Sequence, residues 1–212
     1  MKKRILIISI LVICVFIAGI FIFKSFFKEK ENIVFKMYIS DVYVDDKDNT
    51  TYVTGTIEEG VVKATKDAEI VGLTVNKTKV KKIYLDKKEV KEAKKGDFVS
   101  IAVDSDYSTI NRGMMLASKD LVKPVKVFKL SIERNNVMED LIIEKTTDLV
   151  FRMGTEDYAG EVINDTNIKV LENGTIEVEL DDKAPIYKDL DVVVKYDGKT
   201  VIGTGKVVEI VK

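Results

Sequence analysis

Apolar and polar side chains alternate in short runs along most of the chain beyond residue 32, with the period of two that is typical of half-buried β-strands. Turn-forming residues separate the runs. One turn, Asp197-Gly198, is a tight-hairpin signal, because both residues tolerate a positive φ. The pattern predicts an all-β body. Its runs are FKMYISDVYV, TYVTGTI, EIVGL, KVKKIYL, FVSIAV, VKVFKLSIE, DLVFRM, TIEVEL, DVVVKY and TVIGTGKVVEIV.

Helical periodicity is confined to two short segments, LDKKEVKEAKKG and DYSTINRG, and neither is long enough to cover a sheet. Many short strands without covering helices hide their edges best in closed barrels. One of the two prolines, Pro124, lies midway through the strand-rich part. We therefore predict two consecutive small antiparallel β-barrels, formed by residues 32–122 and 123–212.

The pattern differs near the amino terminus, where an apolar run extends from Ile5 to Phe23 without a charge or a proline. As a helix rising about 1.5 Å per residue, this run would span roughly 28 Å, enough to cross a hydrocarbon core. It is longer than the apolar core of a usual signal peptide, and no small-residue cleavage site follows it. We expect residues 1–31 to be an uncleaved transmembrane signal anchor and a juxtamembrane linker, in contact with the lipid bilayer.

Basic residues flank both ends of the predicted anchor and bear on its orientation. The group before the anchor favours an amino-terminal tail inside the cell. We therefore predict a single-pass cell-membrane protein whose barrels lie on the outer face. The group after the anchor keeps a cytoplasm-facing orientation open as the alternative. The two groups are Lys2, Lys3 and Arg4, then Lys24, Lys28 and Lys30.

The amino-acid composition limits the partners and reactions that can be expected of the predicted barrels. Beyond residue 31 the net charge is about −5, which disfavours a nucleic-acid partner. The chain has no histidine, and its single cysteine, Cys14, lies inside the predicted anchor. The usual general base, a thiolate nucleophile, and histidine and cysteine metal ligands are therefore missing from the predicted barrels. We predict no catalytic residue, no cofactor and no metal site, and leave an enzyme with carboxylate or lysine chemistry as a third class.

The stretches FKMYISDVYV, YVTGTIEEGVVKATKDAEIVGL, VKKIYLDKKEVKEAKKGDFVSIAV and INRGMMLA follow one another through the first predicted barrel. In order and spacing they resemble domain II of elongation factor Tu and related translation GTPases. In the second half, KPVKVFKLSIE, DLVFRMGTEDYAGEV and GKTVIGTGKVVEIV resemble domain III of the same family. The resemblance implies the two-barrel fold, with Gly55 and Gly60 allowing close backbone approach. No GxxxxGK[ST] motif is present, so we expect no binding of GTP.

The resemblance also points to candidate site residues. It places Tyr84 and Phe98 where the family has a glutamate and an asparagine that help form the pocket for the aminoacylated 3′ end of tRNA. We therefore expect these tRNA contacts to be lost. Tyr84, Phe98 and Arg112 are candidate partner-binding residues; the alternative for the two aromatic rings is that they simply pack in the barrel.

These observations favour a membrane-anchored, non-catalytic β-barrel interaction module that binds a protein or peptide partner. The alternative function is a cytoplasm-facing, membrane-tethered, translation-factor-like protein that binds ribosomes or RNA.

Overall fold

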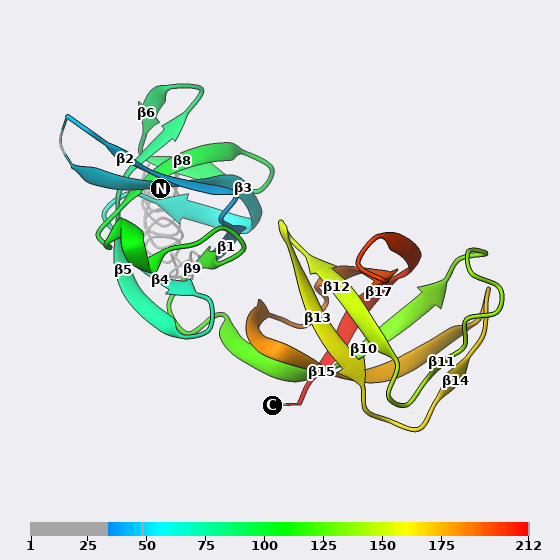
Figure 1. Cartoon of the computed structure of the whole chain (residues 1–212). Helices are drawn as coiled ribbons and strands as arrows, with labels where there is room; N and C mark the ends of the chain where they lie inside the picture. Colours follow the sequence, from blue (N-terminus) through cyan, green and yellow to red (C-terminus); the bar gives the residue numbers. More distant parts are fainter. Residues whose placement is uncertain (1–33, 48, 212) are drawn as a thin grey trace, which may run out of the picture. The chain divides into compact units, whose positions relative to one another are not determined.

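The computed structural model describes residues 34–47 and 49–211, and their regular structure is almost entirely β-strand (Figure 1). The all-β prediction is therefore confirmed. The predicted transmembrane segment, residues 5–23, lies outside the described residues. Within the described ranges, no helix combines the length and the apolar character needed to cross a membrane.

The first barrel is closed by antiparallel pairing of strands between residues 35 and 117. The ring runs β1-β9-β4-β5-β8-β3, and β3 returns to pair with β1. Three further strands extend this sheet: β2 and β7 pair with β3, and β6 pairs with β5. The bounds are β1 Phe35–Tyr38, β2 Asp41–Asp45, β3 Thr50–Lys63, β4 Asp67–Val71, β5 Val75–Leu85, β6 Lys88–Val90, β7 Glu92–Lys94, β8 Phe98–Val103 and β9 Met115–Ala117.

Close approach of β1 to β3 depends on two glycines. A Cβ at Gly55 would collide with the Tyr38 carbonyl oxygen, and a Cβ at Gly60 would collide with that of Val34. Gly60 also has a φ of +78°, a conformation that L side chains rarely adopt. The expectation that both glycines permit close backbone contact is confirmed.

The second barrel is a closed ring of strands in the order β10-β15-β13-β12-β16-β17, and β17 pairs with β10. Inside it, the rings of Phe128 and Phe151 meet edge to face with centroids 6.0 Å apart. The short strands β11 and β14 pair with each other. The bounds are β10 Lys123–Arg134, β11 Ile143–Glu144, β12 Asp148–Met153, β13 Glu156–Val162, β14 Asn167–Ile168, β15 Asn173–Ile186, β16 Asp191–Tyr196 and β17 Thr200–Ile210.

Turn residues set the hairpins. Asp197 and Gly198 have φ values of 54° and 74° between β16 and β17, as the Asp-Gly signal predicts. The interpretation of LDKKEVKEAKKG as a helical turn is wrong. Asp86 and Lys87 both adopt positive φ, which reverses the chain so that Lys88 pairs with Leu85, and the segment forms β6 and β7. The other segment does contain a single 3-10 turn, η1 Tyr107–Thr109.

Tyrosines join the two barrels within the compact unit Val34–Lys212. The Tyr38 hydroxyl donates to the carbonyl of Pro185 at 3.2 Å, and the Tyr158 hydroxyl donates to the carbonyl of Gly113 at 3.3 Å. Tyr38 belongs to the same apolar cluster as the core of the second barrel. We call these contacts the junction. There the outer surface of the first barrel is covered by another part of the chain.

Candidate functional site: an aromatic cavity on the first barrel

Four aromatic side chains point outward from neighbouring strands of the first barrel. Tyr43 on β2 lies directly opposite Tyr52 on β3, and Tyr84 on β5 lies opposite Ser100 on β8. Phe98 is two residues before Ser100, so it faces the same side of the sheet. The intervening residues of β3 and β8 point into the core; they include Val53, Val99 and Ile101.

The rings lie close enough to support one another. Tyr43 and Tyr52 are stacked, with centroids 5.2 Å apart and planes 8° from parallel. Tyr84 is tilted against Tyr52 at a centroid distance of 6.0 Å. Such pairs contribute roughly 0.5–1.5 kcal/mol beyond the apolar area that they bury. Tyr52 forms the covered base of this group at 6 % exposure, whereas Tyr43 is 42 % and Phe98 is 60 % exposed.

Together the four rings line a cavity of about 680 Å³. This volume lies in the usual range for small-molecule and side-chain pockets, roughly 300–1,000 Å³. Apolar and polar groups are mixed along its walls. We call this feature the aromatic cavity. Its lining residues are Tyr43, Asp45, Tyr52, Tyr84, Leu85, Asp86, Lys87, Gly96, Asp97, Phe98, Val99 and Ser100.

Hydrogen bonds hold the walls of the aromatic cavity in place. The Tyr43 hydroxyl lies 2.8 Å from the Ser100 hydroxyl, and the Tyr84 hydroxyl donates to a carboxylate oxygen of Glu89 at 3.4 Å. The Asp97 carboxylate accepts from the backbone N–H of Lys94 at 2.8 Å and closes the turn before β8. This turn sets the position of Phe98, the first residue of the strand. The cavity is therefore largely formed before any ligand enters.

Tyr84 and Phe98, predicted as site residues, both line this cavity. The alternative that both rings simply pack in the barrel is wrong for Phe98, which is largely exposed. Their role in binding a partner stays a prediction. Tyr43 and Tyr52 were not among the predicted residues. Their outward positions on facing strands of a hairpin follow from the alternation, so the signal was present.

Arg112, the third candidate, is not among the residues that line the aromatic cavity. Its Nε lies 2.7 Å from a carboxylate oxygen of Glu156, and its Nη2 donates to the carbonyl of Thr155 at 3.0 Å. These partners belong to the second barrel and its β12–β13 turn. The structure therefore places Arg112 at the junction, apart from Tyr84 and Phe98.

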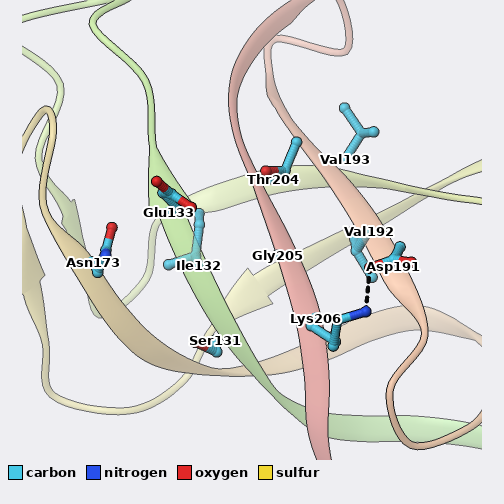
Figure 2. Close-up of a pocket in the computed structure, with 10 residues that line it drawn as sticks. All are labelled: Ser131, Ile132, Glu133, Asn173, Asp191, Val192, Val193, Thr204, Gly205 and Lys206. Atoms are coloured by element: carbon cyan, nitrogen blue, oxygen red, sulfur yellow. Dashed lines mark hydrogen bonds and ion pairs between the residues drawn. The ribbon is translucent and has the colours of Figure 1, made fainter.

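The second barrel has a cavity of about 510 Å³ on strands β10, β15, β16 and β17, shown in Figure 2. Its lining is different in kind: no aromatic ring is among its lining residues, and Lys206 is already paired with Asp191 (Figure 2). Because it lacks aromatic rings and its one base is already paired with a carboxylate, it offers less to a ligand. The aromatic cavity is the stronger candidate.

Metal-ligating residues do not gather in the part of the chain that the structure describes. There, no group of three or more histidine, cysteine, aspartate or glutamate side chains is arranged to hold a metal ion.

Comparison with known families bears on the first barrel. Residues 50–117 match the family model for elongation factor Tu domain 2. The matched segment runs from the start of β3 to the end of β9 and includes Tyr52, Tyr84 and Phe98. Together with the two closed barrels, this match supports the resemblance to elongation factor Tu domains II and III. The matched domain is a β-barrel domain of that factor and not its GTPase domain.

Proposed function

We propose that this chain is a membrane-anchored, non-catalytic interaction module that binds a protein or peptide partner through the aromatic cavity. The barrels are of translation-factor type, and the anchor is the apolar run of residues 5–23. We place the barrels on the outer face of the cell membrane, on the basic residues that precede the anchor.

The observation that carries this proposal is the exposure of Phe98 and Tyr43 at the mouth of a formed cavity. Leaving large aromatic surfaces in water forgoes the stabilisation that their burial would give. Aromatic side chains are enriched in the few residues that dominate protein–protein binding energy. The rings are also held by the sheet and by hydrogen bonds, so little freedom is lost on binding.

The identity of the wall residues also supports a partner other than aminoacyl-tRNA. The resemblance places Tyr84 and Phe98, a phenol and a hydrocarbon ring, at the positions of the family's glutamate and asparagine. A phenylalanine ring provides no hydrogen-bond partner for a ribose hydroxyl. Three carboxylates line the same cavity and would repel a phosphate backbone; they are Asp45, Asp86 and Asp97.

Photocrosslinking in membranes tests the proposal. A p-benzoylphenylalanine is incorporated in place of Phe98 and, in a matched control, in place of Leu171, which is 70 % exposed on the second barrel. We expect a discrete protein adduct from position 98 that is absent from position 171. Identical adducts from both positions, or none from position 98, would contradict the proposal.

The match to elongation factor Tu domain 2 favours one second candidate, a cytoplasm-facing protein that contacts ribosomes or RNA. Protease treatment of intact cells separates the two. Digestion of the barrels from outside supports the surface module. Protection, together with crosslinks from position 98 to ribosomal RNA or ribosomal proteins, supports the second candidate.

A further inference from the structure

We propose that the aromatic cavity receives a positively charged side chain, lysine or arginine, from an extended segment of the partner. The inference rests on the proposed peptide-binding function and names the chemistry that this function recognises. It follows from two features that coincide in one place: the exposed aromatic side chains of Tyr43 and Phe98, and an excess of carboxylates around them.

The charges that line the aromatic cavity are unbalanced. Three lining residues are acidic, namely Asp45 at the end of β2, Asp86 in the β5–β6 turn and Asp97 before β8. Among the lining residues, Lys87 is the one base. A ligand that enters the cavity therefore meets a negative potential.

The ring geometry suits a cation. Aromatic faces carry negative charge density, and ammonium or guanidinium groups bind over them within about 6 Å of the ring centroid. The stacked pair of Tyr43 and Tyr52, with Tyr84 tilted beside it, presents rings in two orientations around the cavity. The long methylene stem of lysine or arginine would contact the exposed Phe98 ring while the charged head reaches a carboxylate.

Other ligand chemistry fits less well. A purely apolar side chain would displace water from the carboxylates of Asp45 and Asp97 without offering them a hydrogen bond or a positive charge in its place, which is unfavourable. A nucleic acid would bring phosphates toward the same carboxylates. Residues 88–95, which include β6 and β7, do carry further lysines that are exposed and outside the lining, so solvent and salt screen their effect inside the cavity. These are Lys88, Lys91, Lys94 and Lys95.

The test uses the full-length chain in lipid nanodiscs and a library of random ten-residue peptides. Peptides are selected for binding to the unmodified chain, and those that also bind the Tyr84→Ala/Phe98→Ala double variant are removed. The peptides that remain depend on the aromatic cavity for binding. Selected peptides are then synthesised with each lysine or arginine replaced by norleucine or glutamine. Their affinities are measured for the unmodified chain and for Asp45→Asn, Asp86→Asn and Asp181→Asn variants.

We expect cavity-dependent peptides to share a basic residue whose replacement weakens binding between about threefold and thirtyfold. Asp45→Asn and Asp86→Asn should weaken binding too. Asp181→Asn should not, because Asp181 lies on the second barrel. Binding should also fall as the salt concentration rises.

Two results would overturn the inference in different ways. Cavity-dependent peptides that bind equally well with norleucine in place of the basic residue would contradict the inferred recognition of a cationic side chain. They would leave the proposed peptide-binding function intact. If no peptide depends on Tyr84 and Phe98, while a labelled oligouridylate does, the proposed function itself is contradicted along with the inference.

Discussion

The molecule uses aromatic side chains in two opposite ways. At the junction, Tyr38 is 3 % exposed, and its hydroxyl and ring both meet residues of the second barrel. In the aromatic cavity, Phe98 is 60 % exposed and lies beside other rings of the first barrel. Both groups lie on the outside of the same barrel. They differ in whether another described part of the chain covers them.

The backbone around the two groups differs in the same way. At the junction, a Cβ at Gly154 would collide with the Tyr38 ring, so the turn is shaped to fit that side chain. At the cavity, a Cβ at Gly96 would meet nothing within 4 Å. Among the residues that the structure describes, the junction is therefore a covered interface, whereas the cavity is open. This contrast is why we propose ligand binding at the cavity and a stabilising role for the junction.

The largest loss of stability should come from removing the buried Tyr38 ring at the junction. Tyr38→Ala removes a buried ring, and we expect it to lower the free energy of unfolding by about 3–5 kcal/mol. Tyr38→Phe keeps the ring and loses one hydrogen bond, so it should cost about 1 kcal/mol. Urea unfolding of the chain measures both. A Tyr38→Ala variant as stable as the unmodified chain would show that the junction does not form.

A methyl group at Gly154 should disturb the same contact from the other side. Gly154→Ala introduces strain at a φ of +58° and a collision with Tyr38, and we expect a loss of about 2–4 kcal/mol. Gly96→Ala is the matched control: it carries similar backbone strain at +89° without a collision and should cost roughly 1 kcal/mol. Equal losses in urea unfolding would contradict the close fit at the junction.

Alkaline pH should weaken the junction. Burial raises the pKa of Tyr158 to about 12 and raises the pKa of Tyr38 well above its usual value near 10. The unfolded chain therefore loses protons that the folded chain retains between pH about 10 and 12. The stability that these protonated tyrosines contribute to the folded chain is present below pH about 10 and falls as the pH rises toward 12.

The urea midpoint as a function of pH measures this loss, and near-ultraviolet absorbance follows tyrosinate formation. Tyr158→Phe should flatten the slope, since the variant has one fewer late-titrating group at the junction. Tyrosines that all titrate near pH 10 in the folded chain would be inconsistent with a buried junction.

The smallest effect on stability should come from the cavity. Phe98→Ala removes a side chain that is mostly in water, so we expect the free energy of unfolding to change by no more than about 0.5 kcal/mol. Binding of a cavity-dependent peptide should nevertheless be lost. A large loss of stability would mean that Phe98 belongs to the fold and would remove the contrast with the junction.

Local pattern decided much of the fold. Alternation marked the strands, and Asp197-Gly198 marked a hairpin that the structure confirms. These features depend on neighbouring residues alone, because the side-chain period and the tolerance for positive φ are local properties. The same alternation places Tyr52 and Phe98 on outward positions. LDKKEVKEAKKG shows the limit of local pattern: its periodicity suggested a helical turn, whereas strand pairing through a reversal at Asp86 and Lys87 decided the outcome.

The sequence by itself determined that the body is built of strands, that it resembles translation-factor barrels and that an apolar run precedes it. The tertiary structure decided which outward faces are covered. Arg112 and Tyr38 meet the second barrel, whereas Tyr43 and Phe98, distant in sequence, come together around an open cavity. The physical reason is that alternation specifies the side of a sheet on which a residue lies. What lies against that side depends on contacts between residues far apart in the chain.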